Sequence, residues 1–103
     1  MSGSPFAVAP HEAVGLALLR AHVTPTDDPP AGYNDRRGQL WVRLAAHRTL
    51  PTSKEFEAEW RLLRDMLVAA GAEAPGHGLA PAVTALDGAW GAAIQSGLVK
   101  SWD

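Results

Sequence analysis

The chain has 103 residues, of which 47% are hydrophobic and 19% are charged, and its formal net charge is −2 at pH 7. This length is that of one domain, and the absence of cysteine excludes disulfides, thiol catalysis and thiolate metal ligands. The small negative charge provides no general attraction to nucleic acid or to an anionic membrane, and charged residues interrupt every apolar run before it reaches the roughly 20 residues that span a membrane.

Residues 1–9 are expected to form a flexible N-terminal segment of a single helical domain, 1–103. They lack the charged and long apolar regions of a signal peptide, which predicts a cytoplasmic protein. A first helix is predicted over 11–22, because Pro10 suits a first turn and few polar residues interrupt the apolar surface. Residues 24–33 hold three prolines and two aspartates, which predicts a loop without regular structure.

A second helix is predicted from Asn34 or Asp35, either of which can cap it, to about Leu50. The best-specified helix follows, over 53–70. Thr52 and Glu55 have the spacing of a capping box, and Gly71 is predicted to end the helix. The apolar residues of this segment recur at helical spacing and form one stripe: Phe56, Trp60, Leu63, Leu67 and Ala70.

A second loop rich in glycine and proline, 71–80, precedes a last helix that begins at Pro81. One side of that helix is apolar and includes Leu86, Trp90 and Ile94. The other side is small and uncharged and consists of Ala85, Gly88, Gly91, Ala92 and Ser96. Such residues let another backbone approach closely, so this face is covered either by helices of the same domain or by a second protein chain. No strand pattern is present, and the sequence predicts an all-α, single-domain bundle of about four helices with two Pro/Gly-rich loops.

Residues that often carry chemistry do not form a recognisable site. The four histidines lack the spacing of metal ligands, and no serine lies in a nucleophile turn. Asp87 borders the apolar side of the last helix and is either an acid of raised pKa or, as we favour, the ion-pair partner of an arginine such as Arg20 or Arg43. We therefore expect no enzyme activity, no metal and no cofactor.

A basic run occupies the second helix and the turn after it. Five basic residues and no acid lie between Arg36 and Lys54, and the candidates for nucleic-acid contact are Arg36, Arg37, Arg43, His47 and Arg48. A helix, a short turn and another helix also suggest a helix-turn-helix. However, the helix after the turn begins with three glutamates, which phosphates repel. The other interpretation is a charged face that balances an acidic neighbour.

The leading functional hypothesis is association with another protein chain, as a homo-oligomer, an accessory subunit or an inhibitor of a larger complex. The charged fraction lies below the usual value of about 25%, although a small domain needs much polar surface. The predicted interface is the small face of the last helix together with Trp102, since tryptophan is frequent at binding hot spots. Nucleic-acid binding through the basic helix is the alternative, and no membrane is expected.

Overall fold

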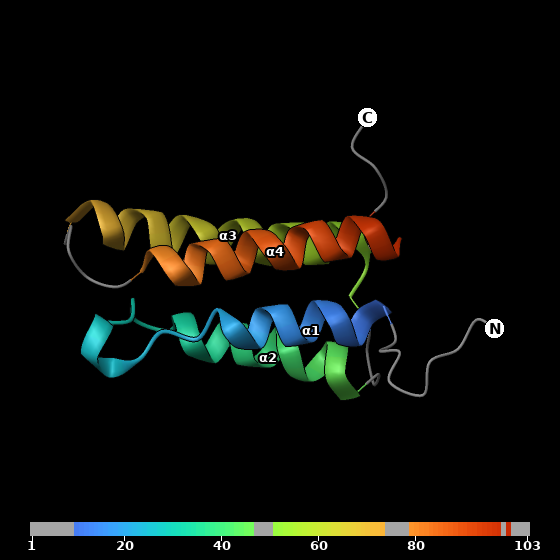
Figure 1. The fold of residues 1–103 in the computed structure, drawn as a ribbon, viewed down its shortest axis with the longest axis horizontal. Coiled ribbons are helices and arrows are strands. Elements are labelled where there is room, and N and C mark those ends of the chain that lie inside the picture. Colours follow the sequence, from blue (N-terminus) through green and yellow to red (C-terminus); the bar gives the residue numbers. More distant parts are fainter. Residues whose placement is uncertain (1–9, 47–50, 74–78, 98, 100–103) are drawn as a thin grey trace.

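The computed structural model describes residues 10–46, 51–73, 79–97 and 99. Within these ranges the chain forms α1 (Pro10–Arg20), α2 (Tyr33–Ala46), α3 (Ser53–Glu73) and α4 (Ala80–Ser96), with a short 3-10 helix, η1 (Pro25–Asp27), and no strand. Successive helices run in opposite directions, and α1 with α2 forms one layer while α3 with α4 forms the other (Figure 1). The predicted all-α bundle is therefore confirmed.

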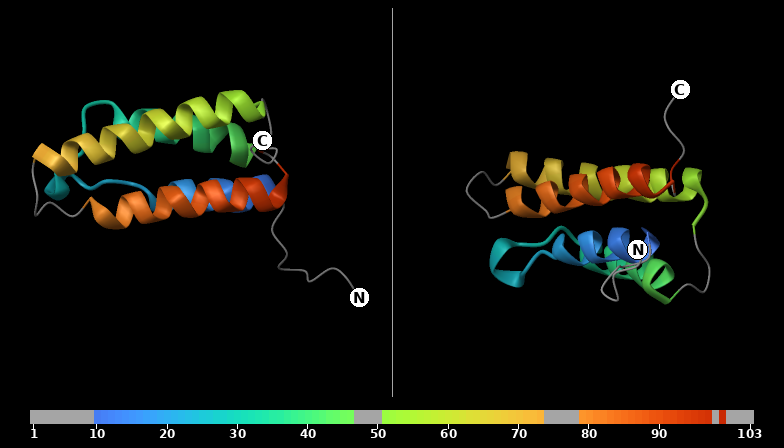
Figure 2. Two further views of the ribbon diagram at one scale, coloured as in Figure 1. Left: turned by 90° about the horizontal axis from the view of Figure 1, so that it is seen from above. Right: turned by 45° about the vertical axis from the view of Figure 1, so that its right-hand side comes forward.

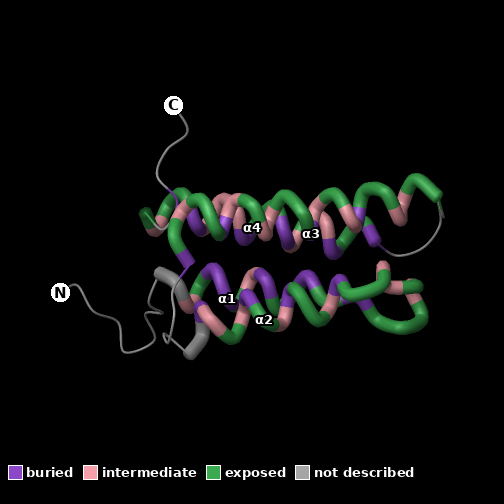
Figure 3. The backbone as a smooth tube through the Cα atoms, turned by 180° about the vertical axis from the view of Figure 1, so that it is seen from behind, coloured by how far each residue is buried: buried purple, intermediate pink, exposed green. Residues whose placement is uncertain are grey.

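The helices form a closed ring of neighbours around a common core. Contacts are most extensive between α1 and α4, followed by α1 with α2, α3 with α4, and α2 with α3. Viewed from above, α4 lies over α1 and α3 lies over α2 (Figure 2). Buried positions gather on the helix sides that face the other layer (Figure 3). The core includes Val14, Leu18, Tyr33, Leu40, Leu44, Phe56, Leu63, Leu67 and Leu86.

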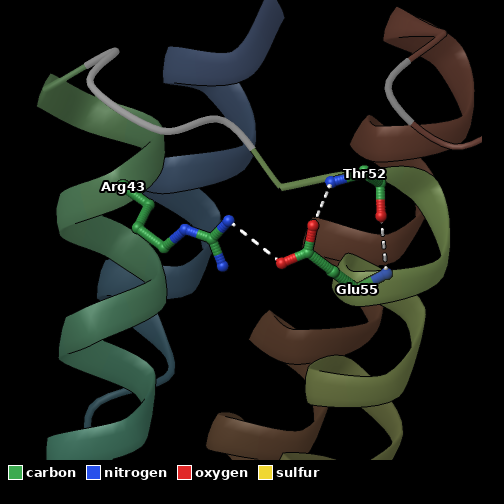
Figure 4. A network of polar contacts seen from close by, with 3 residues as sticks. All are labelled: Arg43, Thr52 and Glu55. Atoms are coloured by element: carbon green, nitrogen blue, oxygen red, sulfur yellow. Dashed lines mark hydrogen bonds and ion pairs between the residues drawn. The ribbon is translucent and has the colours of Figure 1, made fainter.

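Helix α3 follows its prediction most closely. Glu55 N–H donates to Thr52 Oγ1 over 3.2 Å, and Thr52 N–H donates to Glu55 Oε1 over 3.2 Å, which is the expected capping box (Figure 4). The predicted end at Gly71 is wrong, because the helix continues to Glu73. Among the described residues, no neighbouring atom lies within 4 Å of a Cβ built at Gly71, so this glycine is not required there for close packing against them.

The ends of α1 and α2 also differ from their predictions. Helix α1 stops at Arg20, not at 22, and α2 begins at Tyr33. The predicted end of α2 near Leu50 lies outside the described residues. The connection is not wholly irregular, since it contains η1, and Asp28 takes a left-handed φ of 56° directly after it.

Three side chains from the start of α2 hold the end of α1, and we call Tyr33, Asn34 and Arg37 the α1 clamp. Tyr33 Oη donates to Ala21 O over 2.9 Å. The Asn34 amide bonds both backbone groups of Val23, accepting from N–H at 3.1 Å and donating to O at 2.6 Å. The Ala21 carbonyl and both backbone groups of Val23 thus bond to side chains of α2, which explains why the helix ends early. Asn34 was an expected N-cap for α2, and the structure instead uses its side chain on Val23.

Two tryptophans join α3 to α4. The rings of Trp60 and Trp90 stack with centroids 4.4 Å apart, and Trp60 Nε1 donates to Leu86 O over 2.8 Å. Beside them, Arg64 Nε donates to Asp87 Oδ1 over 3.0 Å. The predicted ion pair of Asp87 is confirmed, but its predicted partners are wrong, because Arg64 of the facing helix takes that place.

Candidate interaction surfaces

The arginines of the basic helix α2 face a row of glutamates on α3. Arg43 Nη2 lies 3.2 Å from Glu55 Oε2 (Figure 4), and Arg36 Nη1 lies 3.8 Å from Glu59 Oε2. The pKa of the Glu55 carboxyl is lowered, first by the backbone hydrogen bond from Thr52 and then by the bond from Arg43. This arrangement corresponds to the second interpretation of the basic run, in which a charged face balances acids of the same domain.

Arg37 points into the protein, with only 6% of its surface exposed. It donates through Nη1 to Leu18 O and through Nη2 to His22 Nδ1, each over 3.2 Å. Its Nε has no hydrogen-bond partner within the described ranges. Burial lowers the pKa of Arg37, and burial also raises the pKa of the neighbouring Tyr33 to about 12. The remaining two candidates of the basic run, His47 and Arg48, lie outside the described residues.

The small face of α4 is partly open in the single chain. Among the described residues, no neighbouring atom lies within 4 Å of a Cβ built on Gly88 or Gly91, so the helices that the structure describes do not cover these two glycines. Ala85 and Ala92 are partly buried and pack against the core. Ser96 Oγ donates to Ala93 O over 3.1 Å. Trp102 lies outside the part of the chain that the structure describes.

A second open surface lies on α1 and α2, on the sides turned away from the core, and we call Leu16, Leu19, Trp41 and Val42 the α1–α2 surface. Leu16 is 45% exposed, Leu19 is 42% exposed and Val42 is 49% exposed. Leu19, Trp41 and Val42 line an open groove of about 600 Å³. Leu16 lies one turn before Leu19 on the same helix. The sequence prediction did not include this surface, because α1 is apolar on almost every side and its periodicity does not distinguish core from surface.

Gly15 brings the two helices of this surface together. A Cβ at this position would lie 3.4 Å from Trp41 Cδ1 and 3.6 Å from Leu44 Cβ. The first distance is at the short end of ordinary van der Waals contact, so Trp41 packs closely on the backbone of α1. The groove therefore has an aromatic side chain in its wall that packs against both helices. Exposed apolar residues on the other helices, namely Leu62, Val68 and Ile94, are spread over α3 and α4.

Sites for other chemistry are not apparent in the described ranges. No group of three or more histidine, aspartate or glutamate side chains there has an arrangement that suits a metal ion. Among the helices described, none combines the length and apolar character needed to cross a membrane. Comparison of the chain with protein-family models, with curated proteins and with solved structures finds no match.

Proposed function

We propose that this protein acts by binding another protein chain and does not catalyse a reaction. The observation that carries the proposal is the α1–α2 surface, where three large apolar side chains, each 42–49% exposed, lie on adjacent helices beside an open groove. Apolar area removed from water contributes about 25 cal/mol per Å². Contiguous apolar patches on small proteins commonly mark interaction sites.

The composition of the groove matches that of a protein interface. Its lining combines Leu19, Trp41 and Val42 with polar side chains such as Asn34, Asp35 and Gln39. Contacts between proteins likewise combine apolar and polar side chains. An amphipathic helix is the element that lies most readily in a groove between two helices. Our proposal includes three forms of this association: the protein forms a homo-oligomer, serves as an accessory subunit, or inhibits a larger complex.

The small face of α4 is retained as a second expected contact. Gly88 is exposed and Gly91 is partly exposed, and a helix of another chain approaches such a surface more closely than it approaches one with long side chains. Trp102 remains a predicted anchor. Nucleic-acid binding by α2 has less support, because Arg36 and Arg43 pair with glutamates and Arg37 is buried.

A matched pair of variants tests the proposal. Val42 is 49% exposed on the α1–α2 surface and Val68 is 48% exposed on α3, so glutamate at either position disturbs a similar amount of apolar area. Wild-type, Val42→Glu and Val68→Glu proteins are used as baits in an extract of the source organism. We expect wild type and Val68→Glu to retain the same protein and Val42→Glu to lose it. Equal retention by all three baits would contradict the proposal.

A further inference from the structure

We propose that the partner of the exposed side of α1 is a second copy of this chain, packed antiparallel about a two-fold axis that passes beside Leu16. This inference rests on the proposed function, since it names the partner for one part of the α1–α2 surface. An isologous interface of this kind requires a surface that is complementary to itself.

The order of residues on α1 provides that complementarity. Glu12, Leu16 and Arg20 follow one another at intervals of four residues, so they lie along one side of the helix. Leu16 is 45% exposed and Arg20 is exposed, while Glu12 is partly buried. An acid, an apolar residue and a base thus stand in line, with the apolar residue in the middle.

A two-fold axis at Leu16 brings opposite charges together. A residue that lies a given number of positions before Leu16 in one chain faces the residue the same number of positions after Leu16 in the other chain. Glu12 therefore faces the partner's Arg20, and Arg20 faces the partner's Glu12. Leu16 packs on the partner's Leu16. Glu12 and Arg20 each lie about 6 Å from Leu16 along the helix axis. The axes of two packed helices are about 8–10 Å apart, and the long side chains of Glu12 and Arg20 bridge that distance.

Two other residues of α1 that are described as exposed obey the same symmetry. Ala13 and Leu19 stand three residues on either side of Leu16, and both are exposed. The axis therefore places Leu19 against the partner's Ala13, a large side chain against a small one. Parallel packing of two copies would instead place acid against acid and base against base, which selects the antiparallel arrangement.

The groove beside Leu19 enlarges the contact. Trp41 and Val42 line this groove, and a second copy that crosses α1 covers them as well. A stable dimer buries about 800 Å² on each chain. One short helix such as α1 supplies only part of that area, so the contribution of α2 is required for the dimer.

The arrangement is tested by reversing the charge at Glu12 or at Arg20 and then mixing the two variants. Sedimentation velocity at low salt measures how tightly each sample dimerises. Glu12→Arg creates two Arg–Arg contacts across the axis and Arg20→Glu creates two Glu–Glu contacts, so each variant alone is expected to dimerise roughly tenfold more weakly than wild type. A mixture of the two variants restores both opposite-charge contacts and is expected to form a heterodimer as tight as wild type, to within about threefold. A variant that fails to fold would not form a dimer with the other variant, so recovery of the dimer on mixing excludes a folding defect as the cause of weaker dimerisation.

Glu57 of α3 is partly buried, as Glu12 is, and pairs within its own helix with Arg61 at 2.9 Å. The control variant is Glu57→Arg. It is expected to leave the dimer unchanged. A wild-type protein that stays monomeric, or charge variants that dimerise like wild type and show no preference for each other, would overturn the inference. If wild type is monomeric while Val42→Glu loses a different host protein, the second copy is excluded and the proposed function stands.

Discussion

Arg37 of α2 donates a hydrogen bond from Nη1 to the carbonyl oxygen of Leu18 in α1 over 3.2 Å, from a position where the side chain is almost fully buried. A residue from the middle of a basic run thus works as a structural tie between two helices. The guanidinium meets the Leu18 carbonyl near the C-terminal end of α1, where the helix dipole favours a positive charge.

Arg37→Met is therefore expected to lower the free energy of unfolding by about 2 kcal/mol, because it removes a hydrogen bond from a charged donor and leaves the Leu18 carbonyl with the Ala21 N–H alone. Arg36→Met is the matched control, since Arg36 is exposed and lies 3.8 Å from Glu59, and its effect should stay below about 1 kcal/mol. Urea denaturation measures both. Equal losses for the two variants would show that Arg37 has no special structural role.

Tyr33 provides a pH test of the α1 clamp. Its pKa is raised from 10.0 to about 12 by burial, and its hydroxyl donates to Ala21 O. The unfolded chain releases the tyrosine proton first, so the stability from this group is complete below pH 10 and is lost as pH rises through about 12. The expected loss is roughly 2–3 kcal/mol.

Tyr33 is the one tyrosine of the chain, so the ultraviolet absorbance of tyrosinate reports its pKa without interference from other tyrosines. The folded protein should titrate near 12 and the urea-unfolded protein near 10. Tyr33→Phe should lack this component of the alkaline stability loss. A folded-state midpoint close to 10 would mean that the hydroxyl is accessible to water.

Thr52→Ala tests the capping box of α3. It removes the acceptor of the Glu55 N–H, and loss of such a cap costs about 1 kcal/mol in unfolding free energy. Thr84→Ala is the control, because Thr84 is exposed in α4, and it should change stability by less than about 0.5 kcal/mol. Thr52→Ala also removes the side-chain hydrogen bond from Thr52, which lowers the pKa of Glu55 less than the backbone bond that the variant keeps. That pKa should therefore rise only part of the way toward its ordinary value, and NMR titration of the carboxyl measures it. A Thr52→Ala protein as stable as wild type would argue against the cap.

The basic helix yields a prediction about nucleic acid. Arg36 and Arg43 already contact Glu59 and Glu55, so a phosphate would have to compete with carboxylates for both. We expect no salt-sensitive mobility shift with duplex DNA or single-stranded RNA at near-physiological salt. A shift that disappears in the double variant Arg36→Glu, Arg43→Glu would favour the nucleic-acid alternative.

Local signals in the sequence predicted α3 well. Its capping box and its apolar stripe depend on residues within a few positions of each other, and Phe56, Leu63 and Leu67 are buried as expected. The end of α1 was predicted less well, because side chains of α2 more than ten residues away hold it. The partner of Asp87 was wrong for the same reason, since Arg64 lies on another helix.

The α1–α2 surface shows a further limit of periodicity. Helix α1 carries leucines at 16, 18 and 19, and the pattern alone does not say which of them face the core. Packing against α2 and α4 buries Leu18 and leaves Leu16 and Leu19 outside. The small face of α4 was recognisable from its composition, but whether another helix covers it depends on tertiary packing.

The mass of the chain in a gently prepared extract of the source organism tests the central claim most directly, because it detects a second copy and a different partner alike. We predict that wild-type protein and the Val68→Glu control sediment well above the monomer mass of 10.9 kDa, and that the double variant Leu16→Glu, Val42→Glu sediments as a monomer. Sedimentation of the wild-type chain as a monomer would contradict the claim that the α1–α2 surface binds protein.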